Sequence, residues 1–229
     1  MGIHGYNFKV KKLVIFGTSE IAELANYYFT TDSEHTVAGF TVDQEYKASD
    51  SFLGKPLVSF ESIQDEFPPD LYDLFVALSY TDMNELRKSK YQEAKRLGYK
   101  LVSYVSSHST ILNDGQIGDN CFILEDNTIQ PSVIIGNNVT LWSGNHIGHH
   151  SKIQDHVFIS SHVVVSGGVV VEESCFLGVN ATLRDHIVIG SKTLIGAGST
   201  IMKSTDPFAV FAPKPTEMRD IRSDQLRKI

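Results

Sequence analysis

A six-residue repeat in the second half of the chain limits what the protein can fold into. Every sixth residue from Ile111 to Ile201 is isoleucine, leucine or valine, and the position four residues beyond each is small or β-branched, apart from two asparagines. A helix needs an apolar spacing near 3.6, and a lone strand needs a spacing of two. Six residues make one short strand and one corner, and three such units close a coil of about eighteen residues. The repeat predicts a parallel β-helix of about five coils.

Small residues in this repeat have two expected roles. We interpret the glycines that directly follow the aliphatic residue as corners that need backbone freedom; they are Gly118, Gly136, Gly148, Gly178, Gly190 and Gly196. Both cysteines, Cys121 and Cys175, fall in the small inward register. We therefore expect buried structural thiols and no disulfide framework, which fits a reducing cytoplasm.

The residues before the repeat have a different pattern. Apolar runs at 13–16, 37–42, 57–59, 73–78 and 100–104 alternate with helical segments, which predicts a small, parallel, Rossmann-like α/β sheet. One helix is expected to follow Asp82, with Glu85 completing a capping box, and to stop at Gly98. We divide the chain into an α/β domain (1–104), a β-helix (105–206) and a C-terminal extension (207–229).

The carboxyl ends of parallel strands share one edge of a sheet, where ligands bind. This predicts one site around Gly17, Thr18, Ser19, Asp43 and Tyr80. The sequence G-T-S-E is not a dinucleotide fingerprint, so a nucleotide site and a plain strand–helix turn both remain open.

Composition excludes some classes of partner. A net charge of −7 gives no reason to expect nucleic acid. No stretch approaches the roughly twenty apolar residues of a membrane span, and the N-terminus has no secretory signal pattern. We expect a cytoplasmic protein that does not bind membranes.

Five histidines fall within about one coil of the repeat: His146, His149, His150, His156 and His162. None occupies an inward register, so a solvated side chain is the ordinary interpretation of each. Gly167 and Gly168 lie one coil after His149 and His150 and would leave space and backbone N–H groups beside them. A neutral imidazole base next to such donors suits acyl transfer.

A family resemblance extends this interpretation. The α/β domain, the unbroken repeat and the segments I-G-H-H-S-K-I-Q-D-H-V-F-I-S-S-H, S-G-G and C-F-L-G-V-N-A-T-L resemble bacterial nucleotide-sugar N-acetyltransferases of the hexapeptide-repeat, sialic-acid O-acetyltransferase-like family. The resemblance implies a left-handed β-helix, a homotrimer with sites between neighbouring prisms, acetyl-CoA as co-substrate and no metal. It implies acetylation of a UDP-, dTDP- or GDP-linked 4-amino-4,6-dideoxy sugar for surface polysaccharide or glycan synthesis.

Carried onto this chain, the resemblance makes His149 the base and Gly167 the contact of the acyl thioester. His150, which we also count among the catalytic residues, stands where the family often has an acidic residue that orients the base. Asp155, Glu125 or Asn145 are the candidates for that orienting role. The resemblance assigns Gly178, Gly196, Lys203 and Lys214 to CoA, and Gly17, Thr18, Ser19, Asp43 and Tyr80 to the nucleotide. Three alternatives stay open: an O-acetyltransferase, a zinc enzyme like the γ-class carbonic anhydrases, and a non-catalytic trimeric scaffold.

Overall fold

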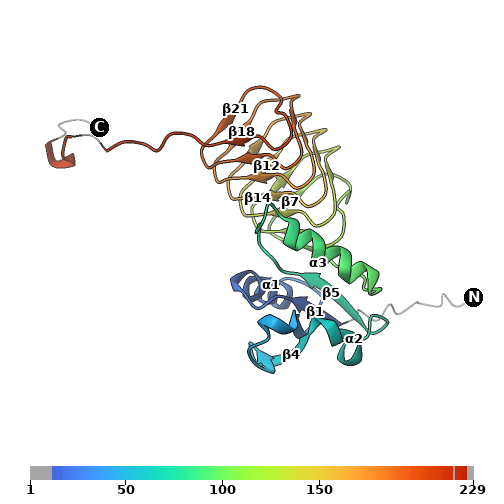
Figure 1. Cartoon of the computed structure of the whole chain (residues 1–229). Coiled ribbons are helices and arrows are strands. Elements are labelled where there is room, and N and C mark those ends of the chain that lie inside the picture. The colour runs from blue at the N-terminus through green and yellow to red at the C-terminus, as the bar shows by residue number, and fades with distance from the viewer. Residues whose placement is uncertain (1–11, 219, 226–229) are drawn as a thin grey trace, which may run out of the picture.

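The computed structural model describes residues 12–218 and 220–225 of this 229-residue chain. An α/β domain is followed by a stack of short parallel strands that forms a β-helix, and helix α3 (Glu85–Arg96) lies between them (Figure 1). The predicted fold class, an α/β domain followed by a parallel β-helix, is confirmed.

The N-terminal domain is built on one five-stranded sheet in the order β3-β4-β2-β1-β5. Its strands are β1 (Lys12–Phe16), β2 (Val37–Val42), β3 (Ser51–Phe52), β4 (Lys55–Ser59) and β5 (Tyr72–Val76). All neighbours are parallel except β3 and β4. The predicted all-parallel sheet is therefore mixed at one edge, because Leu53 and Gly54, with φ of 48° and 72°, form a two-residue hairpin turn.

The segment 100–104 was expected to be a further strand of this sheet, and that prediction is wrong. Only Leu101 pairs with β5, through a single bridge to Leu74. Tyr104 belongs to the β-helix instead, because it pairs with Phe122 one coil later.

Helices cover both faces of the sheet. Helix α1 (Glu20–Thr31) packs Ala25 and Phe29 against the face that carries Leu13 and Ile15. Helix α2 (Ile63–Glu66) and α3 pack against the opposite face. Short 3-10 helices span Gln44–Tyr46, Phe60–Ser62 and Ser223–Gln225.

Helix α3 begins differently from the prediction. Asp82, Met83 and Asn84 all have left-handed backbone, with φ of 51°, 50° and 69°, so Asp82 does not cap the helix. The cap residue is Asn84, and the Glu85 carboxylate pairs with Lys192 Nζ at 2.9 Å instead of closing a capping box. Gly98, with φ of 87°, follows the end of the helix as predicted.

The β-helix consists of two-residue strands in three parallel sheets. One sheet holds β6 (Tyr104–Val105), β8 (Phe122–Ile123), β11 (Thr140–Leu141), β14 (Phe158–Ile159), β17 (Phe176–Leu177), β20 (Leu194–Ile195) and β22 (Val210–Phe211). The second holds β7 (Thr110–Ile111), β9 (Thr128–Ile129), β12 (His146–Ile147), β15 (Val164–Val165), β18 (Thr182–Leu183) and β21 (Thr200–Ile201). The third holds β10 (Ile134–Ile135), β13 (Lys152–Ile153), β16 (Val170–Val171) and β19 (Val188–Ile189).

Both repeated registers point into the prism, as predicted. The aliphatic residues from Ile123 to Ile201 and the small register from Cys121 to Ser199 are all buried. Neighbouring coils pair residues eighteen apart, such as Thr140 with Phe158. The core of the prism is therefore one continuous column of apolar side chains.

The strained corner positions are not where the sequence analysis placed them. Left-handed residues lie three positions past the aliphatic residue, as at Asn120 with φ of 51°. The glycine that directly follows the aliphatic residue has no positive φ; a Cβ on Gly118, for example, would lie 2.5 Å from Gly136 O. These glycines are needed because successive coils approach closely. The explanation by backbone freedom is wrong.

The left-handed residues stack into three edges of the prism. Such positions favour Asn, Asp, His and Gly. We name them the α3 edge (Asn120, Asn138, His156, Ser174, Lys192), the His149 edge (Asp114, Ser132, His150, Gly168, His186) and the third edge (Asp126, Gly144, His162, Asn180, Gly198).

Helix α3 fastens the two domains along the α3 edge. The buried Arg87 guanidinium donates to Asn138 O and, at 3.0 Å, to His156 O. Asn120 Oδ1 also accepts a hydrogen bond from Val76 N at 2.7 Å. The end of β5 is thus held against the prism.

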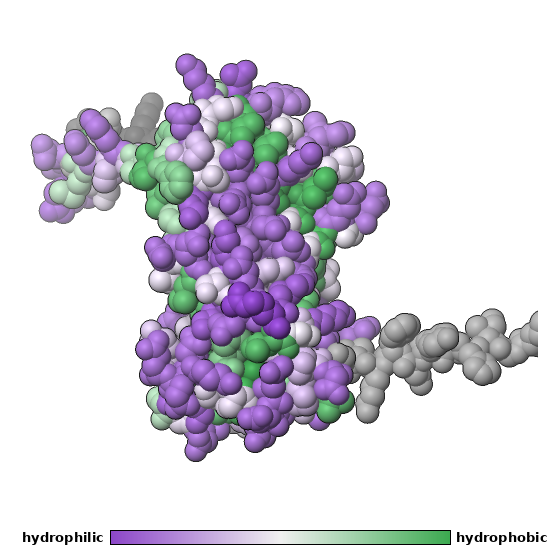
Figure 2. Space-filling model, turned by 45° about the vertical axis from the view of Figure 1, so that its right-hand side comes forward, coloured by the Kyte–Doolittle hydropathy of each residue, from purple (hydrophilic) through white to green (hydrophobic). Residues whose placement is uncertain are grey.

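The outer surface is mostly hydrophilic on the face shown in Figure 2, with separate hydrophobic patches on both halves. After β22 the chain leaves the prism as an extended segment (Figure 1). No helix in residues 12–218 and 220–225 is long and apolar enough to cross a membrane.

Candidate functional site

His149 lies one residue before the left-handed His150 on the His149 edge, and its imidazole folds toward the next coil. A Cβ on Gly167 would lie 2.6 Å from Cε1 and 2.8 Å from Nε2 of His149. Gly167 has no positive φ, so space and not backbone conformation makes glycine necessary there. The Cε1–Nε2 edge of the ring thus occupies the space that a side chain at position 167 would need.

Side chains one coil later cap the backbone N–H at the equivalent position of two coils. On the α3 edge, Asn137 Oδ1 accepts from Asp119 N at 3.1 Å, and Asp155 Oδ1 accepts from Asn137 N at 2.7 Å. The coil spacing brings each acceptor directly beside the N–H of the coil before it.

The Gly167 N–H lacks such a cap. The residue one coil later is Asp185, whose carboxylate lies 3.6 Å from Arg184 Nε instead. Gly167 N–H donates to no group within the described part of the chain, whereas Gly168 N–H donates to His149 O at 2.8 Å. Of the two backbone donors expected beside His149, one is open.

His150 contacts the opposite side of the His149 ring. The two Nδ1 atoms are 3.1 Å apart, so one ring donates and the other accepts. Gln130 Oε1 accepts from the backbone N–H of His149 at 2.8 Å. Both imidazoles are exposed in the single chain, and Nε2 of His149 remains available to a ligand.

The other groups considered for orienting His149 bond elsewhere. Asp155 accepts from Asn137 N at 2.7 Å, Glu125 from Tyr28 OH at 2.8 Å, and Asn145 from Val163 N at 2.7 Å. None of these three groups bonds the His149 ring in the described part of the chain; His150, which was not expected to orient the base, does.

The five histidines that are close in sequence do not form a cluster in space, because one coil carries them around the prism. His146 lies on β12, His156 on the α3 edge and His162 on the third edge. Left-handed backbone at 150, 156 and 162 accounts for histidine at three of the five positions.

His156 is buried under α3 instead of facing solvent. Its Nδ1 lies 2.9 Å from Asn138 Nδ2. Burial, followed by the positive charges of Lys88 and Arg87, lowers the pKa of His156 to about 4. This histidine is therefore a neutral packing residue.

The sequence pattern overlooked His186, one coil beyond Gly168 on the His149 edge. A Cβ on Gly168 would lie 2.7 Å from His186 Cε1, so a second imidazole covers the glycine pair from the later coil. The eighteen-residue count that linked His149 to Gly167 also links Gly168 to His186 and could have found it.

Gly17, Thr18 and Ser19 connect β1 to α1 at the carboxyl edge of the sheet. Gly17 has φ of 123°, and a Cβ there would lie 2.8 Å from Ala77 O. Thr18 is half-buried, and Ser19 precedes α1 without a side-chain capping bond. Glycine is required by the close approach of the chain after β5.

Asp43 follows β2 at the same edge, whereas Tyr80 does not join these residues. Lys90 Nζ of α3 bonds Asp43 at 2.5 Å. Burial opposes the charge of Lys90, but hydrogen bonds to Asp43 and Glu93 outweigh it and raise the pKa of Lys90. The Tyr80 ring lies on the prism, 5.0 Å from Phe158 and 4.7 Å from Phe176 between centroids.

The four residues assigned to CoA occupy three places. Gly178 and Gly196 border the third edge, and a Cβ on Gly178 would lie 2.6 Å from Ala197 N. Lys203 follows β21 on the His149 edge, three coils beyond His149 and about 14 Å along the prism at 4.8 Å per coil. Lys214 lies in the extended segment after β22.

Neither cysteine is suited to nucleophilic catalysis. Cys121 and Cys175 are buried, and burial raises the pKa of each thiol to about 12. Among the described residues, no three His, Cys, Asp or Glu side chains are grouped so that they could hold a metal ion.

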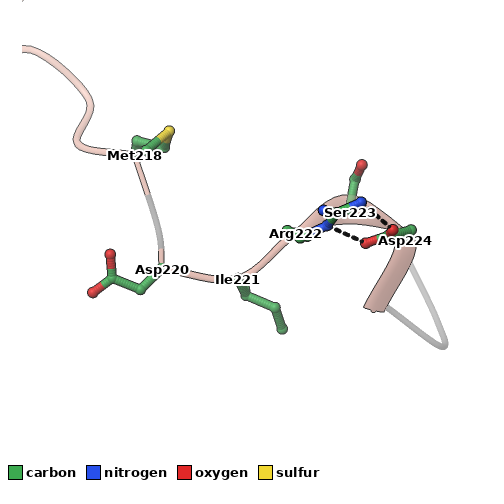
Figure 3. Close-up of a pocket in the computed structure, with 6 residues that line it drawn as sticks. All are labelled: Met218, Asp220, Ile221, Arg222, Ser223 and Asp224. Carbon is green, nitrogen blue, oxygen red and sulfur yellow. Dashed lines mark hydrogen bonds and ion pairs between the residues drawn. The ribbon is translucent and has the colours of Figure 1, made fainter.

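A hollow in the C-terminal segment is formed by nearby residues of the same segment (Figure 3). Arg222 and Asp224, which are two of its lining residues, form an ion pair at 2.6 Å. None of the predicted site residues lines this hollow. We place the candidate site on the His149 edge because His149 and Gly167 lie together there.

Comparison with known proteins agrees with this architecture. Residues 114–149 and 132–167 match the family described as bacterial transferase hexapeptide (six repeats). This part of the chain thus carries the hexapeptide repeat that the family model describes. No curated protein sequence matches the chain.

Solved structures share the fold over most of the chain. Perosamine N-acetyltransferase from Caulobacter crescentus, with CoA and GDP-perosamine, is 21% identical, with a TM-score of 0.79 over 88% of this chain and 93% of that one. The acetyltransferase domain of PglB from Neisseria gonorrhoeae, with acetyl coenzyme A, is 19% identical, with a TM-score of 0.77 over 88% and 95%. WeeI from Acinetobacter baumannii is 18% identical, with a TM-score of 0.74 over 88% and 96%. The predicted resemblance to these enzymes is confirmed as a shared fold.

Proposed function

We propose that this protein is an acetyl-CoA-dependent N-acetyltransferase that acts on a nucleotide-linked amino sugar of the 4-amino-4,6-dideoxyhexose type. The observation that carries the proposal is the His149 ring resting on Gly167, whose backbone N–H is open. The fold supports it, since similar structures were solved with CoA and GDP-perosamine or with acetyl coenzyme A.

The chemistry is direct transfer. The neutral sugar amine attacks the thioester carbon of acetyl-CoA, and the carbonyl π pair moves to oxygen. The Gly167 N–H donates to this oxyanion, and Nε2 of His149 takes the proton that the nitrogen loses. The oxyanion then reforms the carbonyl, the C–S bond breaks, and the protonated His149 gives its proton to the departing CoA sulfur. No protein nucleophile is needed.

His150 sets the tautomer that this chemistry requires. Nε2 of His149 accepts a proton only if the ring hydrogen sits on Nδ1, because neutral imidazole carries one N–H. His149 must therefore donate to His150 Nδ1 across the 3.1 Å contact. In this chain His150 fills the role of a carboxylate by acting as a hydrogen-bond acceptor.

The donor and acceptor sites follow from the edges of the prism. Lys203, on the His149 edge, is suited to the CoA phosphates, with Lys214 as a second cation. Gly178 and Gly196 border another edge and reach the same CoA only from a neighbouring copy, as in a homotrimer with sites between prisms. The nucleotide is assigned to the sheet edge at Gly17, Thr18, Ser19 and Asp43, with Tyr80 at the domain junction.

The test measures CoA release from acetyl-CoA with a panel of UDP-, dTDP- and GDP-linked amino and hydroxy sugars. His149→Ala is expected to lower kcat/KM by about 10² to 10⁴-fold, while the control His146→Ala stays near wild type. Near-wild-type activity of His149→Ala would remove His149 as the base. Release with hydroxy sugars alone would indicate O-acetylation, and no release with any sugar would overturn the proposal.

A further inference from the structure

Two imidazoles lie against neighbouring glycines on the His149 edge. His149 lies against Gly167 from the earlier coil, and His186 lies against Gly168 from the later coil; their Cε1 atoms are 2.6 Å and 2.7 Å from the respective Cβ positions. Adjacent Cα atoms are only about 3.8 Å apart. The two rings therefore lie against backbone positions that are one residue apart, and we name this Gly167–Gly168 backbone the floor.

His186 is fixed to this floor by its backbone but not by its side chain. Its N–H donates to Gly167 O at 3.0 Å. The side chain is 73% exposed, and its one polar contact among the described residues is long, with Nε2 3.9 Å from Asp185 Oδ2. The ring is thus a cover over Gly168 that does not contribute to the buried core.

The reaction geometry leaves the acyl substituent little room. With its oxygen at Gly167 N–H and the amine beside Nε2 of His149, a thioester carbonyl has two further substituents. The sulfur carries the long CoA arm, which needs an open path along the prism. The acyl chain must then extend over Gly168, where the His186 ring lies.

We propose that His186 closes the floor at Gly168 and restricts the donor to a two-carbon acyl group. This inference rests on the proposed acyltransferase function and adds a residue that determines which donor is used. Acetyl fits between the rings, whereas each further methylene meets the imidazole of His186.

The chain offers a matched pair of variants. His186 and His162 both have left-handed backbone, with φ of 56° and 58°, and His162 covers Gly144 in the same way, with Cε1 2.6 Å from the Cβ position. Asparagine tolerates this backbone and is shorter. His186→Asn therefore opens the proposed floor, and His162→Asn makes the equivalent change on the third edge.

The experiment compares kcat/KM for acetyl-, butyryl- and hexanoyl-CoA with one accepted sugar. Wild type and His162→Asn should prefer acetyl- to butyryl-CoA by about 100-fold or more, and His186→Asn should reduce that preference at least tenfold by gaining activity with butyryl-CoA. Melting temperatures check folding, and His186→Gly replaces His186→Asn if the latter does not fold.

Three outcomes would overturn the inference. They are a preference in His186→Asn within twofold of wild type, an equal change in His162→Asn, or an equal loss with all donors in a folded His186→Asn protein. If the wild type uses none of the acyl donors with any sugar, the proposed function itself fails, which separates that case from a failure of the His186 assignment.

Discussion

The imidazole of His149 lies against Gly167 of the next coil, with Cε1 2.6 Å from the position that a Cβ of residue 167 would occupy. The conflict that a methyl group would cause is with the end of a movable side chain. Gly167→Ala should therefore push the ring away from its place beside the open Gly167 N–H and lower kcat/KM by about 10² to 10³-fold, while the melting temperature stays near wild type. Steady-state kinetics and a thermal melt of the same sample check this.

For Gly178 we expect a loss of stability instead, because a Cβ there would lie 2.6 Å from the backbone N of Ala197. Backbone of the next coil cannot rotate away, so Gly178→Ala should cost about 1–3 kcal/mol of unfolding free energy. Urea unfolding measures it, with Gly167→Ala as the control. Equal stability of the two variants would contradict the distinction between a space-giving and a packing glycine.

The period alone predicted the β-helix. Buried positions such as Ile147 and Val163 follow from counting six, and the contact of His149 with Gly167 follows from counting eighteen. The repeat is so informative because each coil rests directly on its neighbour. The location of a residue in the prism is then set by its position within the six-residue and eighteen-residue periods.

Counting residues along the repeat could not predict features that depend on the junction between the two domains. His156 is buried because α3 covers its edge, and Tyr80 leaves the sheet edge to pack on Phe158. Both facts come from how one domain docks on the other. The spread of the histidines over three edges, by contrast, follows from their spacing of six residues in the repeat. It was overlooked because residues close in sequence were assumed to be close in space.

The Nδ1 contact between His149 and His150 predicts opposite effects of two substitutions at the same position. His150→Glu supplies an acceptor and should retain activity within about tenfold, since it keeps the hydrogen on His149 Nδ1. His150→Arg supplies only donors, forces the hydrogen of His149 onto Nε2 and should lose at least about 100-fold in kcat.

The position has a φ of 61°, so both long side chains carry a similar backbone strain and each serves as the other's control. The readout is kcat with saturating acetyl-CoA and sugar, together with the melting temperature. Equal kcat for the two folded variants would show that His150 does not set the tautomer.

His156 predicts a stability change with pH. Its pKa of about 4 in the folded chain is below the ordinary value of 6.5, so between these pH values the unfolded chain binds a proton that the folded chain does not. Stability is therefore fully present above about pH 6.5 and falls as the pH drops toward 4, by up to about 3 kcal/mol. Asparagine fits the φ of 65°, and His156→Asn should flatten the curve. Urea unfolding between pH 7 and 5 checks this, and parallel curves for the two proteins would contradict it.

We expect the hydrogen bonds of Arg87 to hold the α/β domain on the β-helix. Its buried guanidinium donates to Asn138 O, to His156 O at 3.0 Å and to Asn84 Oδ1 at 2.9 Å. Burial lowers the pKa of Arg87 to about 10, which leaves it charged at neutral pH. Arg87→Met should leave these acceptors unpaired and cost roughly 2–4 kcal/mol of unfolding free energy.

Lysine cannot reproduce the forked donor, so Arg87→Lys should also destabilise the protein. The neighbouring Lys88, which pairs with Glu173 at 3.4 Å, provides the control: Lys88→Met should cost less than about 1 kcal/mol. If Arg87 couples the domains, urea unfolding of Arg87→Met should separate into two transitions, with the α/β domain unfolding first because it loses its attachment to the prism. A single transition at the wild-type midpoint would show that the other contacts of α3 hold the domains together without Arg87.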